Sequence, residues 1–486
     1  MAKSAAGILI AGEWVPLERT YTVRNPARPA EAVGEFAHAG PEHVDAAYAA
    51  AKRAAAEWRR TPALERGEIL QRTAAILAER SEEIATDFTR EEGKTLAEAR
   101  GEVQRGVQIL RFFAGEAAQP RGEVHPSAAR DRFLYSVREP LGVVCLITPW
   151  NFPVAIPLWK IAPALAYGNT VVWKPATITP GTAVGVATAL VDAGLPAGVL
   201  NLVTGPASSV GGSLTEHPEV DGISFTGSLE VGRGIQLAAV ERGVKVQLEL
   251  GGKNPVIVLD DADVEQAVEQ TVRGAMMSTG QKCTATSRAI VVGDAGDRFT
   301  PALLDRVARL RVGDPLDPAT DIGPLSSIEQ FETVTGYLDV AREEGHRLGA
   351  GGAPLDTDDG GYFVEPTVYL DVDPASRIGR EEIFGPVLGV MRAASLDHAL
   401  EVANSVEFGL SASIFTRDLA RAFEFIDSVE AGVVHVNSET AGAEPQVPFG
   451  GMKASSSHSR EQGKAAIDFY TQVKTVYLDM PPRETI

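Results

Sequence analysis

Apolar and polar positions divide the chain into a helical first part and a longer part in which short apolar runs alternate with helical stretches. In residues 41–60 and 81–117, apolar side chains recur at helical spacing among Ala, Glu, Arg and Leu, which predicts amphipathic helices. Helical stretches such as residues 182–195 separate the later apolar runs. These β-branched runs lie beyond Pro140, at residues 142–148, 169–173, 199–204, 221–227, 244–250 and 254–260. Alternating strands and helices predict a parallel sheet that is covered on both faces.

A second alternating set follows the glycine pair Gly251–Gly252, where we place a domain boundary. Its apolar runs are SRAIVVG, FVEPTVYLDV, FGPVLGVM, LSASIFT and GVVHVN. Two strand-like segments fit neither set, residues 132–140 (RFLYSVREP) and residues 470–479 (YTQVKTVYLD). We expect these two segments to pair with each other as a protruding sheet edge, which would invite another subunit. The predicted fold class is therefore α/β, with two α/β domains.

Charge and composition exclude several classes of partner. The formal net charge of -20 over 486 residues argues against a nucleic-acid or anionic-membrane partner, since both require a basic face. The two cysteines are too few for a disulfide framework in a chain of this length, so a cytoplasmic protein is expected. The N-terminus lacks the pattern of a signal peptide, and no apolar run reaches about 18 residues. The eight histidines form no cluster with metal-ligand spacing, so no metal site is predicted.

Cys283 is the candidate nucleophile. It lies in MMSTGQKCTATSR, where its neighbours are polar and Gly280 allows the backbone to approach a substrate closely. The thiolate is the reactive form and the free thiol has a pKa of about 8.5, so a site must lower this pKa or supply a base. A buried structural thiol is an equal alternative on local chemistry alone. Cys145 fits that alternative better, because it lies within the apolar run VVCLI.

Two further polar residues follow predicted strands. Glu249 ends the run QLEL just before Gly251–Gly252, where it could face a cleft and activate water, although a solvated charge at a strand end is the commoner case. Asn151 lies between the prolines of TPWNFP, which would hold its amide rigidly as a donor to an oxyanion. A turn-forming Asn is the alternative.

Two segments are candidates for holding a dinucleotide. Gly227 and Ser228 follow the predicted strand DGISF and open a helix, whose first N–H groups would bind a pyrophosphate. The pattern is G-x-x-x-x-G, which is not the dinucleotide fingerprint and is weak by itself. Lys174 ends the strand TVVWK before Pro175 and could reach a ribose or a phosphate, although a solvated lysine is the ordinary alternative.

Seven motifs together resemble the aldehyde dehydrogenase superfamily. In chain order they are TPWNFP, GNTVVWKPA, FTGS, LELGGKNP, GQKCTATSR, EEIFGPV and PFGGMK, and the resemblance covers nearly the whole chain. It implies a Rossmann-like cofactor-binding domain at residues 1–121 and 141–250 and an α/β catalytic domain at residues 251–455. It also implies a small bridging β-sheet for oligomerisation, formed by residues 122–140 and 456–486. Members of the family are usually homodimers or homotetramers.

The resemblance assigns a role to each candidate residue. Cys283 matches the nucleophile, Glu249 the general base and Asn151 the oxyanion-hole amide. Lys160 and Glu461 match positions linked to a proton relay. For the cofactor, Lys174 matches the residue that binds the adenosine ribose, Ser228 the residue that contacts the pyrophosphate, and Glu382 with Phe384 the pair that holds the nicotinamide end. The implied cofactor-binding residues are, in full, Ile147, Trp150, Lys174, Thr177, Gly227, Ser228, Glu382 and Phe384.

The implied reaction is NAD(P)-dependent oxidation of a small aldehyde to a carboxylic acid through a thioester. Many members that prefer NAD carry Glu where this chain has Thr177, so we predict that NADP is used at least as well as NAD. A CoA-acylating member would normally lack the Glu249 base.

The substrate is less well defined by the resemblance. The segments STGQKCTATSR and VNSETAGAEPQVPFGGMKASSSHSREQG are similar to those of 2-oxoglutarate semialdehyde (2,5-dioxopentanoate) dehydrogenases. Trp159 stands where succinic semialdehyde dehydrogenases usually have Arg. Trp159, Phe152 and Ile156 suggest a partly apolar tunnel, which leaves broad aliphatic or aromatic aldehyde oxidation open. Lys282 is a suggested partner for a substrate carboxylate.

Overall fold

The computed structural model describes residues 3–119 and 121–480, and its first large sheet has seven strands in the order β12-β11-β8-β9-β10-β2-β3. Strands β8 to β12 are parallel, whereas β2 pairs antiparallel with β10 and with β3. The strands are β2 (Ile8–Ile10), β3 (Glu13–Val15), β8 (Val143–Ile147), β9 (Thr170–Lys174), β10 (Leu200–Leu202), β11 (Gly222–Thr226) and β12 (Lys245–Glu249). The apolar runs predicted from residues 142–250 are thus confirmed as strands of one sheet.

Helices cover this sheet on both faces, as the continuous apolar runs predicted. On β8, Val143 and Cys145 pack with α1 (Pro41–Arg60), α7 (Ala207–Thr215) and α8 (Leu229–Arg242). Val144 and Leu146 pack on the opposite face. The helices of that face are α2 (Ala63–Glu79), α3 (Ser81–Glu92), α4 (Leu96–Glu116), α5 (Ala155–Ala166) and α6 (Pro180–Asp192). The alternation of side chains along a strand explains why both faces are buried.

The predicted helix at residues 81–117 is two helices. α3 ends where Gly93 adopts a left-handed conformation (φ 94°), which glycine tolerates without a Cβ clash. α4 then begins after Thr95, whose hydroxyl accepts a hydrogen bond from the N–H of Glu98, while the Glu98 carboxylate accepts one from the N–H of Thr95. The helical spacing continues across the break, so periodicity alone does not reveal it. The break leaves Lys94 in the junction between the two helices.

The second large sheet has the order β15-β18-β19-β14-β13-β21-β22 and is parallel except for the edge strand β15. Its strands are β13 (Asn254–Val258), β14 (Thr286–Val292), β15 (Arg347–Ala350), β18 (Thr367–Leu370), β19 (Val387–Ala393), β21 (Ser411–Phe415) and β22 (Val433–Val436). One face packs against α9 and α10, and the other against α11 to α14. These helices are α9 (Val264–Met276), α10 (Ala295–Val307), α11 (Ile328–Glu343), α12 (Arg377–Arg380), α13 (Leu396–Asn404) and α14 (Leu419–Ser428).

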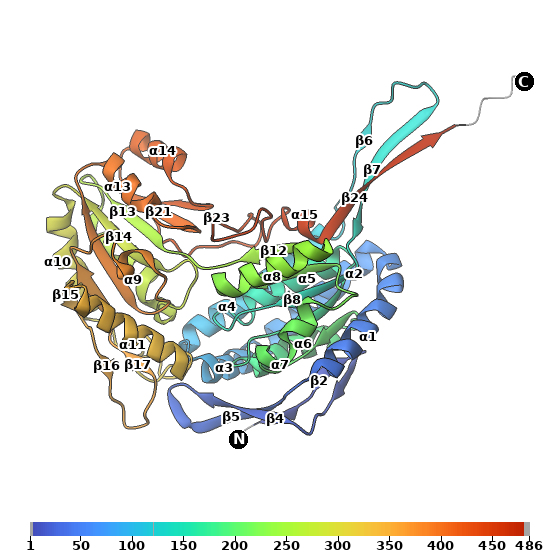
Figure 1. The fold of residues 1–486 in the computed structure, drawn as a ribbon, viewed down its shortest axis with the longest axis horizontal. Helices are drawn as coiled ribbons and strands as arrows, with labels where there is room; N and C mark the ends of the chain where they lie inside the picture. Colours follow the sequence, from blue (N-terminus) through green and yellow to red (C-terminus); the bar gives the residue numbers. More distant parts are fainter. Residues whose placement is uncertain (1–2, 120, 481–486) are drawn as a thin grey trace, which may run out of the picture.

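The chain crosses from the first sheet to the second between β12 and β13, at the glycine pair where the boundary was placed. The two sheets with their helices form the two bodies seen on the right and the left of Figure 1. The division into a cofactor-binding and a catalytic domain stays a prediction. Residues 1–2, 120 and 481–486 of the predicted domain ranges lie outside the described residues.

A small sheet protrudes from the body, as Figure 1 shows. Its order is β24-β7-β6, from β6 (Val124–His125), β7 (Arg132–Pro140) and β24 (Thr471–Asp479), and α15 (Ala466–Tyr470) leads into it. β7 and β24 pair antiparallel, from Thr471 opposite Pro140 to Asp479 opposite Arg132. The predicted pairing of residues 132–140 with 470–479 is therefore confirmed. Val473 and Tyr477 on β24 are exposed.

Short strands and turns complete the fold. β1 (Lys3–Ala6), β4 (Thr20–Asn25) and β5 (Arg28–Ala37) form a three-stranded sheet, and two pairs consist of β16 (Pro354–Leu355) with β17 (Phe363–Val364) and β20 (Phe408–Gly409) with β23 (Met452–Lys453). Among the described residues, no helix combines the length and the apolar character needed to cross a membrane.

Candidate active site

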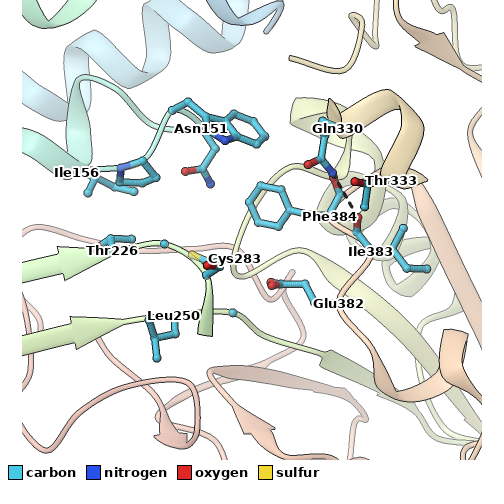
Figure 2. Close-up of a pocket in the computed structure, with 15 residues that line it drawn as sticks. Asn151, Ile156, Thr226, Leu250, Cys283, Gln330, Thr333, Glu382, Ile383 and Phe384 are labelled. Carbon is cyan, nitrogen blue, oxygen red and sulfur yellow. Dashed lines mark hydrogen bonds between the residues drawn. The ribbon is translucent and has the colours of Figure 1, made fainter. Parts of the chain in front are cut away.

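A cavity of about 280 Å³ lies between the two bodies and is lined by residues at the strand ends of the first and by loop and helix residues of the second (Figure 2). Its walls include the segments that follow β8, β11 and β12. The carboxyl ends of parallel strands meet at one edge of a sheet, so loops distant in sequence converge there. The predicted site residues that line this cavity are Trp150, Asn151, Gly227, Ser228, Cys283, Glu382 and Phe384. The predicted residues outside its lining are Ile147, Lys160, Lys174, Thr177, Glu249 and Glu461.

Cys283 is held at the cavity by a constrained loop. The preceding 3-10 turn η1 (Met277–Gly280) contains Ser278 and Thr279, both with positive φ. A Cβ on Gly280 would lie 2.1 Å from the carbonyl oxygen of Gly385, so only glycine fits there. The Asn254 amide donates a hydrogen bond to the carbonyl oxygen of Cys283 (2.8 Å). These contacts fix the backbone and leave the thiol half-buried at the cavity wall.

The thiol of Cys283 is protonated at neutral pH in this state. Burial, reinforced by the negative charges of Glu382 and Glu249, raises its pKa to about 12. Hydrogen bonds from the backbone N–H groups of Thr284 and Cys283 lower this pKa in part. The thiolate therefore forms only when a neighbour removes the proton or a positive charge enters the cavity.

Asn151 lies in the loop after β8 and is buried. Its side-chain amide donates a hydrogen bond to the carbonyl oxygen of Gln281 (3.0 Å), two residues before Cys283. Figure 2 shows the amide directed into the cavity on the side of Cys283. A rigid N–H donor in this place can stabilise negative charge on an oxygen bonded to a carbon that Cys283 attacks.

Glu249 lies behind the cavity wall, while its neighbours Leu250 and Gly251 line the cavity. It ends β12, and only 2% of its surface is exposed, so it is not the solvated strand-end charge that was the common alternative. One carboxylate oxygen accepts a hydrogen bond from the Ser456 hydroxyl (2.6 Å), and the other has no hydrogen-bond partner among the described residues. Burial raises the pKa of Glu249 well above its ordinary value, and the charge of Glu461 raises it further.

Lys160 and Glu461 form a buried ion pair next to Glu249. Lys160 comes from α5, and its ammonium also donates to the Ser224 hydroxyl (2.7 Å). Because the charge of Glu461 raises the pKa of Glu249, the three ionisable groups belong to one buried electrostatic network. None of the three residues of this network lines the cavity, and their role in a proton relay stays a prediction.

Three predicted cofactor-binding residues lie at or just beyond the carboxyl ends of β9 and β11. Ser228 precedes the first residue of α8 and makes no side-chain capping bond, so the first N–H groups of this helix remain available to an anion. The Lys174 ammonium is buried and donates to the carbonyl oxygen of Pro175 (2.9 Å). It forms no ion pair within the described ranges, and burial lowers its pKa to about 8. The half-buried Thr177 donates weakly to the carbonyl oxygen of Gly205 (3.5 Å).

Glu382 and Phe384 form the opposite wall. The Glu382 carboxylate accepts a hydrogen bond from the N–H of Gly252 (2.9 Å), and burial raises its pKa to about 7. Phe384 has a φ of 58°, uncommon for a bulky residue, and its ring meets Trp150 edge to face at 5.4 Å. This aromatic contact joins Trp150, which follows β8 of the first sheet, to Phe384, which precedes β19 of the second sheet.

Sequence reasoning missed the residues that support these walls. Gln330 on α11 donates to the carbonyl oxygen of Phe384 (2.8 Å), and Ser456 binds Glu249. Gln330 lies in no quoted motif, and Ser456 lies within the segment VNSETAGAEPQVPFGGMKASSSHSREQG, where nothing distinguishes it from the neighbouring serines. No group of three or more His, Cys, Asp or Glu residues in the described part of the chain is arranged to hold a metal ion.

Comparison with known proteins places these features in context. Residues 14–476 match the aldehyde dehydrogenase family. The alpha-ketoglutaric semialdehyde dehydrogenase of Bacillus subtilis is 50% identical over 473 residues, covering 96% of this chain and 97% of the relative. The 2,5-dioxopentanoate dehydrogenase of Saccharolobus solfataricus is 44% identical over 424 residues, covering 87% and 88%. The crystal structure of betaine aldehyde dehydrogenase from Staphylococcus aureus in complex with NAD+ superposes with a TM-score of 0.95 at 37% identity, covering 99% and 95%.

Replacing Glu382 with Gln should accelerate alkylation of Cys283. The change removes the neighbouring charge that contributes most to the raised thiol pKa, while the amide oxygen of Gln can still accept from Gly252. A lower thiol pKa increases the thiolate fraction, so we expect the rate of iodoacetamide inactivation at about pH 8 to rise roughly three- to tenfold. Glu381→Gln is the matched control, because Glu381 pairs with Arg377 on the outside. An unchanged or slower rate in Glu382→Gln would contradict this account of the thiol.

Proposed function

The chain belongs to the aldehyde dehydrogenase family, and we propose that it oxidises an aldehyde to a carboxylic acid through a thioester on Cys283. The observation that carries the proposal is the convergence of the Cys283 thiol and the Asn151 amide on one cavity, with the Glu249 carboxylate just behind its wall. A nicotinamide dinucleotide would accept the hydride.

In the first half of the reaction, Cys283 loses its proton and the sulfur adds to the aldehyde carbon. The resulting oxyanion accepts a hydrogen bond from the Asn151 side-chain amide and one from the backbone N–H of Cys283. Loss of a hydride from the adduct restores the carbonyl and leaves a thioester. The supporting contact is the bond from Asn151 to Gln281, which fixes the amide beside the thiol.

In the second half, a water molecule must lose a proton to become a good nucleophile. Glu249 can take this proton once its carboxylate turns from Ser456 towards the thioester. Only the ionised form of Glu249 acts as a base, and its pKa lies well above the ordinary value. Acyl release should therefore become faster as the pH rises through that pKa. The buried pair of Lys160 and Glu461 would influence this ionisation.

Two substitutions separate the two halves. Cys283→Ala should abolish aldehyde oxidation, whereas Glu249→Gln should keep the first-turnover formation of reduced cofactor and slow acyl release by about 100-fold or more. The rise of acyl release with pH should also disappear in Glu249→Gln. Rapid-mixing measurement of reduced cofactor gives both rates. Cys145→Ala is the matched control, since that thiol is buried in β8, and normal turnover by Cys283→Ala would refute the mechanism.

The residues present fit a nicotinamide dinucleotide. The uncapped first turn of α8 suits a pyrophosphate, and the buried Lys174 ammonium suits ribose or phosphate oxygens. A Cβ on Gly251 would lie 2.3 Å from a carboxylate oxygen of Glu382, so this position must be glycine for Glu382 to keep its place in the cavity wall. From that place the Glu382 carboxylate could bind a ribose. Trp150 and Phe384 would border the nicotinamide, and Ile147, the last residue of β8, would also contact the dinucleotide. Because Thr177 carries no negative charge, we propose that both NAD and NADP are accepted.

Kinetics with both cofactors test the role of Thr177. We expect kcat/KM with NADP to equal or exceed that with NAD. Thr177→Glu should lower kcat/KM with NADP by about 10- to 100-fold, because a carboxylate repels a 2′-phosphate, and should change kcat/KM with NAD much less. Thr188→Glu adds the same charge to the second half of α6 and serves as the control. A native enzyme that strongly prefers NAD would contradict the proposal.

For the substrate we propose a semialdehyde such as 2,5-dioxopentanoate, supported by the relatives that are named for this activity. Of the apolar residues predicted to form a tunnel, Ile156 lines the cavity, and Trp159 packs against Phe449 (5.4 Å between ring centroids). Lys282, the suggested carboxylate partner, donates instead to the carbonyl oxygen of Arg273 (3.1 Å), and burial lowers its pKa. The carboxylate of such a substrate would therefore need another partner.

An aldehyde panel tests the choice of substrate. 2,5-Dioxopentanoate should give the highest kcat/KM, with succinic semialdehyde, benzaldehyde and aliphatic aldehydes at least about tenfold lower, a difference of about 1.4 kcal/mol in the transition state. The product should be the free acid, and added CoA should not alter the rate. A higher kcat/KM for benzaldehyde or propanal would favour a broad-specificity enzyme, and formation of an acyl-CoA would favour a CoA-acylating member.

We further propose that the protein is a cytoplasmic homodimer or homotetramer. The oligomeric state is supported by the protruding sheet, in which β24 is an edge strand with the exposed side chains Val473 and Tyr477. An edge strand of this kind presents unpaired backbone groups to a second subunit.

A further inference from the structure

The junction between α3 and α4 places a lysine directly behind the loop that carries Asn151. The Lys94 ammonium donates a hydrogen bond to the backbone carbonyl oxygen of Asn151 (2.6 Å) and forms an ion pair with Glu102 (Nζ to Oε2, 2.9 Å). Both side chains are only 2% exposed. Lys94 therefore reaches the proposed oxyanion loop from the side opposite to the cavity.

Glu102 holds the same loop at its other end. Its second carboxylate oxygen accepts hydrogen bonds from the N–H groups of Val154 (2.9 Å) and Ala155 (3.1 Å), where α5 begins. A carboxylate at a helix N-terminus satisfies N–H groups that otherwise lack partners. The pair thus binds the backbone on both sides of the short segment that follows Asn151.

Two aromatic rings complete the surroundings of the ammonium. It lies 3.9 Å from the ring centroid of Phe152 and 4.8 Å from that of Phe88. The N–H of Lys94 donates to the Glu92 carboxylate (2.8 Å), which fixes the junction itself. Phe152 is the residue next to Asn151, so a hydrogen bond and a cation–π contact join Lys94 directly to this loop. The ion pair joins Lys94 to the far end of the loop only through Glu102 on α4.

We propose that Lys94 and Glu102 are positioning residues that hold the Asn151 amide where the oxyanion forms. The inference rests on the proposed function, in which Asn151 donates to that oxyanion. A buried ion pair is costly to desolvate and adds little net stability, whereas it fixes the geometry of the groups that it bonds. Displacing a donor by about 1 Å can cost about 100-fold in rate. The alternative is that the pair only stabilises the α3–α4 junction.

A double-mutant cycle separates these possibilities. The variant Lys94→Met/Glu102→Gln removes both charges of the ion pair together, so that neither partner stays buried without the other, and the amide oxygen of the introduced Gln keeps an acceptor for the start of α5. We expect its first-turnover rate of reduced-cofactor formation to fall roughly 10- to 100-fold. Cofactor affinity, measured by quenching of intrinsic fluorescence, should change less than about twofold. In an Asn151→Ala background the same pair of substitutions should change the rate less than about threefold, because the group it positions is gone.

The control is Arg100→Met/Glu82→Gln, which breaks an exposed ion pair (2.6 Å) between α4 and α3 and should leave the first-turnover rate unchanged. The positioning role is wrong if Lys94→Met/Glu102→Gln loses thermal stability but keeps its first-turnover rate. It is also wrong if the two substitutions lower this rate by the same factor in the Asn151→Ala background as in the native enzyme. If Asn151→Ala itself oxidises aldehyde at the native rate, the proposed function of Asn151 fails first. Lys94→Gln/Glu102→Gln, which retains a donor towards Asn151 without leaving the carboxylate unpaired, should lose less rate than Lys94→Met/Glu102→Gln and serves as the second variant.

Discussion

The crossing of the chain between its two large sheets, at Gly251 and Gly252, is the constraint on which the site depends. A Cβ on Gly251 would lie 2.3 Å from a Glu382 oxygen, and a Cβ on Gly252 would lie 2.5 Å from the carbonyl oxygen of Cys283. Real Cβ atoms do not approach other atoms so closely. The backbone between β12 and β13 therefore packs directly against the loop of Cys283 and against Glu382. A side chain at Gly252 would displace the loop of Cys283, and a side chain at Gly251 would displace the Glu382 carboxylate from the cavity wall.

Burial at this crossing also sets the protonation of the site. Cys283, Glu249 and Glu382 all have a raised pKa, and burial is the largest cause for each. Burial therefore favours the protonated form of each group, and the negative charges of Glu382 and Glu249, where these carboxyls ionise, raise the cost of removing the proton from Cys283 further. Under the proposed mechanism, such a site would keep the thiol unreactive until substrate and cofactor are in place, and ionisation of the thiol would be part of the reaction itself.

The sequence predicted those parts of the structure that local patterns determine. Buried parallel strands must be apolar on both faces, so the runs that became β8 to β14 were visible, and the alternation in residues 132–140 and 470–479 indicated their pairing. The break at Gly93 was missed because apolar spacing continues across it. The burial of Glu249 was missed because its orientation depends on Ser456, 207 positions away. Lys94 was missed because its partner carbonyl, that of Asn151, lies 57 positions along the chain.

Helix α4 shows why such distant contacts matter for a site built from loops. Glu98 and Glu102 lie one turn apart on this helix. Glu98 accepts a hydrogen bond from the N–H of Ser278 (2.6 Å), in the turn that precedes Cys283, while Glu102 binds the start of α5 beyond Asn151. Ser278 has a positive φ, a conformation that persists only where the surroundings impose it. One rigid helix face therefore contacts the loop of Cys283 and the loop that follows Asn151. The separation of these two loops is set by the rise of a helix and does not depend on either loop alone.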